Sequence, residues 1–167
     1  MEKTKLLTHA RLVELLEYDP ETGVFKWRRT GKGCRKDLVA GSQYKDWYRQ
    51  ITIDGVSHME HRLAWLYVHG VMPDYEIDHK NTIKNDNRIE NLRPATFSEN
   101  NQNTPITKRN KSGVKCVHWN SHSKKWIGHI QAGGKRHHIG GFDSVEEAAA
   151  AVDAARTRLH GEYANHG

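Results

Sequence analysis

Cysteine is scarce in this chain of 167 residues, which contains only Cys34 and Cys116, far apart and without Cys-x-x-Cys spacing. This scarcity excludes a disulfide framework and a structural zinc held by cysteines. Long apolar runs are missing too. The longest one free of acidic and basic residues, Leu63 to Pro73, is about half of what a membrane span requires. We therefore expect a globular protein stabilised by packing, with no membrane attachment.

The N-terminal residues lack a secretion signal, because they contain no apolar run of signal-peptide length and no small-residue cleavage site. We expect the protein to act in a reducing cytoplasm. Its length, 167 residues and 19.2 kDa, fits one ordinary domain or two small ones. Two small units are the favoured interpretation.

Acidic residues are absent between Glu99 and Asp143, although the net charge of the whole chain is only +6. The same segment contains five histidines and eight cationic residues: Lys108, Arg109, Lys111, Lys115, Lys124, Lys125, Lys135 and Arg136. A charge distribution this one-sided fits a phosphate backbone better than a mixed, solvated surface. Nucleic acid is the expected partner, and a basic surface that only confers solubility is the alternative.

The first part of the chain shows mixed helix and strand signals. Thr8 can cap a helix that contains Leu12, Leu15 and Leu16. The turn residues at positions 19–23 then end this helix. Strands are predicted over 24–28 and 48–53, and a helix over 60–69 that Gly70 closes.

The second part follows a capping box formed by Thr96 and Glu99, which begins a short helix at Phe97. Residues 104–111 are predicted to be a basic linker. Strands are then expected over 114–119, 125–131 and 135–140. A second capping box, at Ser144, begins an alanine-rich helix that ends at Gly161. The expected fold class is α+β, with a three-stranded antiparallel sheet packed on one helix at the end.

Four spaced elements resemble the HNH endonuclease family, and in particular its phage and intron-borne homing enzymes. They are the His61-Arg62-Leu63 segment, Asp78-His79, Asn91-Leu92-Arg93 and Asn100. The resemblance covers residues 55–103 and implies a ββα-metal nuclease domain over residues 1–103. If the gene is phage-borne, the cytoplasm would be that of a bacterial host.

The resemblance also implies a role for each residue of the motif. His79 is the general base for water, which suits an imidazole that is neutral near pH 7. Asp78 and Asn100 are the ligands of a single Mg²⁺ or Mn²⁺, in keeping with their hard oxygen atoms. Asn91 pins the loop of the motif against His79. We accordingly expect Asp78, His79, Asn91 and Asn100 to form the catalytic group.

Other residues near the motif have open assignments. Arg93 either reaches a DNA phosphate or is solvated, and His61 either supports the metal site or plays a structural part in its helix. The chain lacks the paired cysteines that brace some relatives, so packing must hold the loop. The expected anchors are Ile77, Ile83, Ile89 and Leu92.

Residues 112–164 resemble the APETALA-two, or ethylene-response-factor, DNA-binding domain, because three strand signals, a Gly-Gly turn and an alanine-rich helix arrive in order. Cys116 departs from the glycine usual in that family, which suggests tighter local packing. The resemblance implies that residues 112–167 form a DNA-binding domain. Its contact positions are Lys115, His118, Lys125, His129, Gln131, Arg136 and His138.

Strand alternation assigns the faces of this sheet independently. Trp126, Gly128 and Ile130 share one face, which is expected to pack on the small-residue helix. The opposite face is then available for DNA. Trp119 and Trp126 are expected in the core, with a base-stacking role as the alternative.

The sequence thus predicts a metal-dependent DNA endonuclease of the homing type that nicks double-stranded DNA as a monomer. The alternative is a non-catalytic DNA-binding regulator that retains the nuclease scaffold. A third class, an RNA-binding or ribosome-associated protein, explains the charge but not the predicted metal ligands.

Overall fold

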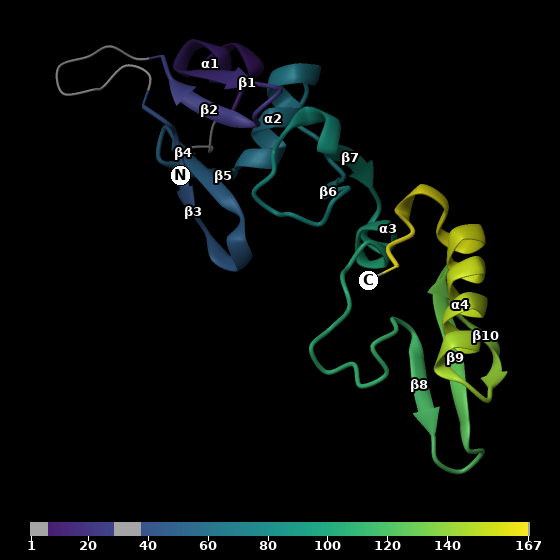
Figure 1. The fold of residues 1–167 in the computed structure, drawn as a ribbon. Helices are drawn as coiled ribbons and strands as arrows, with labels where there is room; N and C mark the ends of the chain where they lie inside the picture. Colours follow the sequence, from purple (N-terminus) through teal and green to yellow (C-terminus); the bar gives the residue numbers. More distant parts are fainter. Residues whose placement is uncertain (1–6, 29–37, 167) are drawn as a thin grey trace, which may run out of the picture. The chain divides into compact units, whose positions relative to one another are not determined.

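The computed structural model describes residues 7–28 and 38–166, and Cys34 lies outside them. The chain divides into two compact units, with the boundary between Pro94 and Ala95. Each unit mixes helices with small antiparallel sheets (Figure 1). None of the helices in the described ranges combines the length and apolar character that a membrane crossing requires.

The first unit begins with a helix and a hairpin. Helix α1 (His9–Leu15) is capped by the Thr8 side chain, and β1 (Leu16–Asp19) pairs with β2 (Val24–Trp27). The prediction missed β1, because Leu16 continues the helical spacing of Leu12 and yet leaves the helix for the strand. The side chains of Leu12, Leu16 and Tyr18 are all buried. The apolar spacing is therefore compatible with core packing from a helix or from a strand, and it does not show where the helix ends.

A three-stranded sheet and a helix follow. The sheet consists of β3 (Ser42–Gln43), β4 (Arg49–Ile53) and β5 (Val56–Met59), with the short 3₁₀ turn η1 (Lys45–Trp47) between the first two strands. Helix α2 (Glu60–His69) has the predicted bounds, and Gly70 closes it at φ 77°. Leu63, Ala64 and Leu66 of α2 are buried in the core of this unit.

Two short strands complete the first unit. They are β6 (Glu76–His79) and β7 (Leu92–Ala95), which form a two-stranded sheet, and the 3₁₀ turn η2 (Ile89–Asn91) precedes β7. Three of the four expected anchors pack on the core, with Ile77 and Leu92 buried and Ile89 partly buried. Ile83 was predicted wrongly: it is 54% exposed at the outside of the loop.

The second unit begins with α3 (Phe97–Gln102), which the reciprocal Thr96–Glu99 capping box starts as predicted. The antiparallel sheet has the order β10-β9-β8, formed by β8 (Val117–Asn120), β9 (Lys125–Ala132) and β10 (Lys135–Phe142). Helix α4 (Val145–His160) is capped by Ser144 and packs on the sheet, and the turn η3 (Gly161–Tyr163) follows it.

The sheet and α4 approach each other closely, as the predicted faces require. A Cβ atom on Gly128 would lie 2.6 Å from Val152 Cγ2, so only glycine allows this contact. Ile130 lies on the same face and is fully buried. The predicted core position of Trp119 is wrong, because this side chain is 49% exposed and packs edge to face on Trp126 at the end of the sheet.

Cys116 combines an unusual backbone conformation with partial burial. Its φ is 68°, in the left-handed region that glycine adopts without steric cost. The glycine of the APETALA-two pattern therefore matches a backbone requirement at this position. The residue also packs, partly buried, on the core of the second unit, so local backbone strain just before β8 accompanies this packing.

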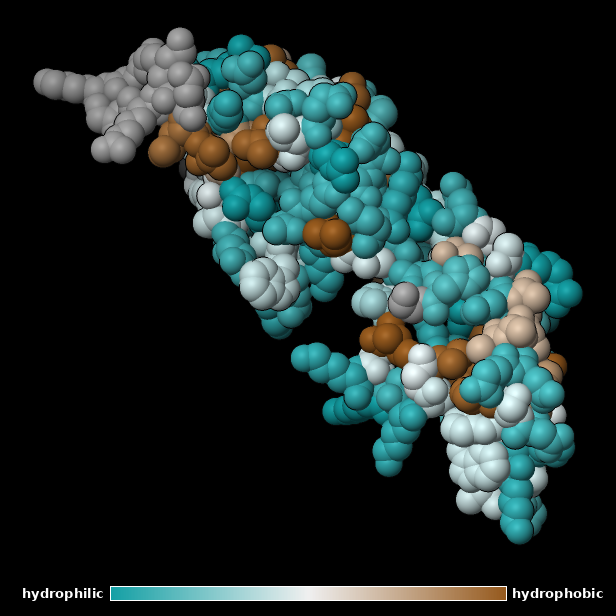
Figure 2. Space-filling model, viewed as in Figure 1, coloured by the Kyte–Doolittle hydropathy of each residue, from teal (hydrophilic) through white to brown (hydrophobic). Residues whose placement is uncertain are grey.

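The surface in view in Figure 2 is mainly hydrophilic, and its apolar residues lie in separate patches. The large exposed apolar side chains are distributed over both units, and Trp47, Val71 and Phe97 are among the most exposed of those described. Isolated apolar residues of this kind are normal on soluble domains.

Candidate active site

The Asp78-His79 pair at the end of β6 is the centre of a buried polar cluster in the first unit. Both side chains are only 4% exposed, although consecutive strand residues point to opposite faces. The rest of the unit thus covers both faces of the short β6-β7 sheet at this point. Buried polar groups of this kind must find partners inside the protein.

Asp78 is paired with Arg93 of β7. The guanidinium donates to Asp78 Oδ2 from Nε at 2.8 Å and from a terminal nitrogen at 2.7 Å. Arg93 is 8% exposed, which contradicts the interpretation as a solvated side chain, while contact with a DNA phosphate stays a prediction. The charge of Arg93 compensates that of a buried carboxylate, which would otherwise be costly to desolvate.

His79 is held by a chain of side chains that the motif does not contain. Its Nε2 lies 3.1 Å from Asn87 Oδ1, and Asn87 Nδ2 donates to Glu60 Oε2 at 3.0 Å. Arg49 Nε donates to both oxygens of Glu60, at 3.1 and 2.9 Å. Asn87 and Glu60 are 1% and 2% exposed, so this chain of hydrogen bonds lies inside the unit.

Two aromatic rings cover His79. The ring of His61 packs edge to face on it with centroids 5.2 Å apart, and Tyr48 lies 6.0 Å from the same ring. Burial lowers the pKa of His79, against the opposing effects of Asn87 and Asp78, and burial with the nearby charge of His79 lowers the pKa of His61 to about 3. Both imidazoles are therefore neutral near pH 7.

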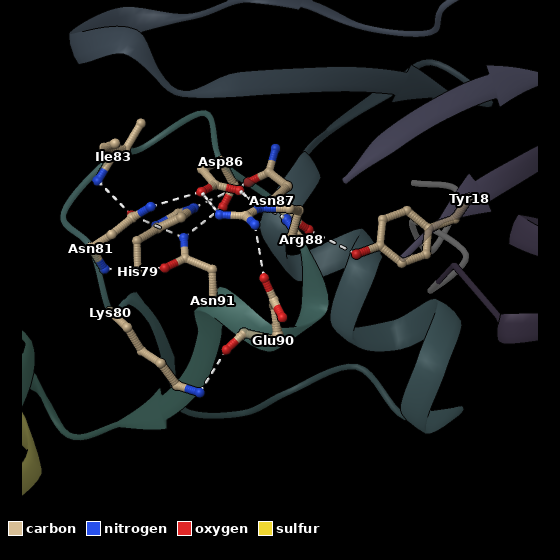
Figure 3. Close-up of polar contacts among 10 residues, drawn as sticks. All are labelled: Tyr18, His79, Lys80, Asn81, Ile83, Asp86, Asn87, Arg88, Glu90 and Asn91. Atoms are coloured by element: carbon tan, nitrogen blue, oxygen red, sulfur yellow. Dashed lines mark hydrogen bonds and ion pairs between the residues drawn. The ribbon is translucent and has the colours of Figure 1, made fainter. Parts of the chain in front are cut away.

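Asn91 closes the loop between β6 and β7, and its predicted role in holding this loop against His79 stays a prediction. Its Nδ2 donates to Asn81 Oδ1 at 3.0 Å and to the backbone oxygen of Asp86 at 2.8 Å, while its Oδ1 accepts from the Asn81 backbone at 3.1 Å. Figure 3 shows these contacts beside the ion pairs of Arg88 with Asp86 and Glu90. The loop that contains Asn87 is thus closed on itself by polar contacts.

Asn100, the fourth residue of the motif, lies on α3 and hence in the second unit. Asp78, His79 and Asn91 are brought together within the first unit. Among the described residues, no group of three or more His, Cys, Asp and Glu side chains could hold a metal ion. Asp78 and Asn100, the two predicted metal ligands, thus belong to different units.

Comparisons with known proteins agree with the motif. The model of a family described as HNH endonuclease matches residues 58–102. Protein 3.8 of Escherichia phage T7 is 31% identical over 122 residues, which are 72% of this chain and 94% of that protein. This chain contains an HNH endonuclease domain at those residues, and it belongs to the same family as Protein 3.8. No solved structure matches this chain.

The HNH domain at residues 58–102 therefore includes His61, the whole predicted catalytic group and α3. Asn87, Glu60 and Arg49 are the functional candidates that sequence reasoning missed. Glu60 resembles an ordinary acidic residue in the first turn of a helix, and Asn87 is one of several asparagines in a polar loop. Arg49 lies before the residues that match the family, so the motif could not identify it as a functional residue.

The second unit carries the predicted DNA contacts on the face of the sheet opposite α4. Strand register places them in adjacent pairs, with His118 beside Ile127, His129 beside His138, and Gln131 beside Arg136. His118 also packs edge to face on His129 at 5.3 Å. Six of the seven residues, all except Lys115, share this face or its edge.

Two of these cations have partners within the unit. The ammonium of Lys115 donates to the backbone oxygens of Gln102, Thr104 and Asn165, which makes it a structural crosslink between α3 and the C-terminal residues. Lys125 pairs with Asp143 at 2.6 Å, but both side chains are exposed. An exposed ion pair of this kind is weak, so Lys125 can exchange Asp143 for another partner, whereas the ammonium of Lys115 is held by three backbone oxygens.

Proposed function

We propose that this protein is a metal-dependent DNA endonuclease of the homing type that nicks duplex DNA. The observation that carries the proposal is the position of His79 in an HNH family domain: it is buried, neutral, held by Asn87 and adjacent in sequence to a buried carboxylate. A neutral imidazole in a fixed orientation is the form that accepts a proton from water.

His79 would act through Nδ1. Since Nε2 faces the carbonyl oxygen of Asn87, the hydrogen of the neutral ring belongs on Nε2, and Nδ1 keeps the lone pair. In the proposed reaction Nδ1 takes the proton of a water that attacks the phosphorus in line. The P–O bond to the 3′ oxygen breaks, which gives 5′-phosphate and 3′-hydroxyl ends.

Asp78 and Asn100 would hold one Mg²⁺ or Mn²⁺. The donor set fits this type of ion, because it consists of carboxylate and amide oxygens and leaves positions for water and phosphate. When bound, the ion would stabilise negative charge on the leaving oxygen. Arg93 would keep the Asp78 carboxylate in place through the contacts to Oδ2.

The sheet of the second unit would position the nuclease on DNA, as an APETALA-two-like domain does. Its exposed face offers His118, Gln131, Arg136 and His138, together with the partly exposed Lys125 and His129. Arginine and lysine suit phosphates or guanine, and glutamine can read adenine in the major groove. One active site in each chain fits cleavage of one strand by a monomer.

The test is incubation of the full chain with supercoiled plasmid, with Mg²⁺, with Mn²⁺ and with a chelator. Nicked circles that appear only with the metals support the proposal. Tight binding to duplex DNA without nicking under any of these conditions would instead favour the non-catalytic regulator. Preferential binding to RNA of the same sequence would favour the third class.

A further inference from the structure

We propose that Asn87 is a positioning residue for His79, whose amide selects the imidazole tautomer with hydrogen on Nε2 and is itself oriented by Glu60 and Arg49. The inference rests on the proposed function of His79 as the base. It adds to that function the hydrogen bonds that keep the lone pair on Nδ1 of His79, the nitrogen proposed to accept the proton.

The orientation of the Asn87 amide follows from its second partner. The Glu60 carboxylate accepts hydrogen bonds on both oxygens from Arg49 Nε and lies against the side-chain amide of Asn87. A carboxylate in that environment accepts hydrogen bonds, so the NH₂ group of Asn87 must face Glu60. The carbonyl oxygen then faces His79 Nε2, which must be the donor.

The position of Asn87 is fixed by its backbone as well. The hydroxyl of Tyr18, on β1, donates to the Asn87 backbone oxygen at 2.7 Å, and Figure 3 shows this contact reaching the loop from the hairpin. Gly23, in the turn of the same hairpin, lies so close that a Cβ atom would be 2.5 Å from the Asn87 carbonyl carbon. The N-terminal hairpin thus braces the loop at this residue.

Glu60 is enclosed in a similar way. A Cβ atom on Gly41 would lie 2.2 Å from Glu60 Oε1, and Arg49 also donates to the backbone oxygen of Ala40 at 2.9 Å. The segment around residues 40–41 therefore closes over the carboxylate. Burial raises the pKa of Glu60, while the hydrogen bonds from Arg49 and Asn87 act in the opposite direction and favour its charged form.

An amide suits this position better than a charged residue. It presents an acceptor to His79 and a donor to Glu60 with no net charge of its own. An aspartate at position 87 would place a second carboxylate against the buried Glu60, and a leucine of similar size would leave both neighbours without a partner. Partners that orient metal-ligating histidines contribute about 10-fold to 100-fold to metal affinity or activity, and we expect an effect of the same order for the partner of a general base.

The experiment compares the wild type with Asn87→Leu and with Asn85→Leu, the matched control at an exposed position of the same loop. Long-range ¹H–¹⁵N spectra of the metal-free full chain at neutral pH report the tautomer of His79. We expect the Nε2–H form in the wild type and the control, and its loss in Asn87→Leu. Single-turnover cleavage at saturating DNA should fall about 10-fold to 100-fold in Asn87→Leu, with DNA affinity changed less than about two-fold.

Glu60→Gln is the second variant, for the case that Asn87→Leu does not fold. Its amide can donate as well as accept, so Asn87 is free to turn over and the spectrum should show both tautomers of His79. A wild-type His79 with hydrogen on Nδ1, or an unchanged tautomer in both variants, would overturn the proposal. If the tautomer depends on Asn87 and the wild type fails to cut DNA, the positioning role stands and the endonuclease function fails.

Discussion

The two units place their polar side chains in opposite ways. In the first unit seven polar or charged residues among those described are buried: Glu60, His61, Asp78, His79, Asn87, Asn91 and Arg93. In the second unit the corresponding residues are Asn103 and Arg156, whereas His118, Gln131, Arg136 and His138 of the sheet are exposed. The first unit thus buries a polar network beside its apolar core, whereas the second unit buries mainly a small apolar core.

The difference fits the two tasks proposed for these units. A reacting group must be held in one orientation, and buried hydrogen bonds in a low dielectric do this at the cost of desolvation. A face that contacts a long charged polymer must instead be open, and exposed side chains on a rigid sheet provide it. Each variant below changes one of the two units, and the expected effects decrease from the buried network to the exposed sheet and the turn before it.

The largest effect is expected for His79→Ala. Removing the general base should lower the rate of plasmid nicking by about 10²-fold to 10⁴-fold, because proton transfer by a positioned side chain contributes on that order. DNA affinity should remain nearly intact, since the exposed face of the second unit is unchanged. Nicking at the wild-type rate would show that the base lies elsewhere.

Acid should destabilise the first unit more than the second. The pKa of His61 is lowered to about 3 in the folded state from an ordinary value of 6.5, mainly by burial. The folded state binds this proton less readily than the unfolded chain, so its stability is fully present above pH 6.5 and falls as the pH decreases toward 3. The loss is roughly 1.4 kcal/mol for each pH unit, or about 3 kcal/mol between pH 6 and pH 4.

This prediction is measured by urea unfolding followed by peptide-resolved hydrogen exchange, with the α2 segment as the reporter. His61→Phe should reduce the dependence on pH in that range. The control is His122→Phe, which removes an exposed histidine in the second unit. Equal pH dependence in both variants would contradict the assignment to His61.

A smaller effect is expected for Arg136→Ala on the exposed face of the sheet. Affinity for duplex DNA should fall about 10-fold, and the slope of log affinity against log salt should decrease by about 1 if the contact is to phosphate. Arg158→Ala is the matched control, because it removes the same charge from an exposed position on α4. Similar losses in both variants would mean that net charge, and not the sheet face, controls binding.

Substitution is a better test of this face than truncation. The sequence alone suggests that a chain ending near Asn110 would keep the nuclease. In the structure, Lys115 binds the Gln102 oxygen at the end of α3, and Asn165 Nδ2 donates to the Asn103 oxygen at 3.0 Å. A truncated chain would therefore lose contacts that hold the helix bearing Asn100.

The smallest effect is expected for Cys116→Gly. Glycine adopts the left-handed conformation at this position without steric cost, so the second unit should gain up to about 1 kcal/mol of stability. Cys116→Ala keeps the strained conformation and should bring no such gain. The measurement is the melting temperature of each variant in thermal unfolding. Equal melting temperatures for Cys116→Gly and Cys116→Ala would contradict the strain at Cys116.

Local signals in the sequence were sufficient for much of the fold. The bounds of α2, the capping box of α3, the capped start of α4 at Ser144 and the helix-facing side of β9 all follow from spacing and from caps a few residues away. Spacing also identified the HNH motif within the range that the family match confirms. The predicted role of each motif residue stays a prediction, apart from the loop contacts of Asn91.

Other features were decided only by tertiary structure. The switch from α1 to β1 at Leu16 depends on pairing with β2, and the partners of Arg93 and Lys115 are set by which chain segments meet. Arg156 gave no sign in the sequence that it would be fully buried and donate to the backbone oxygen of Lys115. Long polar side chains have many possible partners, and periodicity does not choose among them.

The sequence by itself therefore determined the positions of α1 to α4 and of strands β2, β4, β8, β9 and β10, together with the faces of the second sheet and the HNH motif, because periods and caps act over a few residues. The tertiary structure decided how His79 is held. Asn87 and Glu60 are 27 residues apart, and their contact exists only because α2, the loop and the N-terminal hairpin pack together. A buried hydrogen bond depends on position in space, and that position is set by the packing of the whole unit.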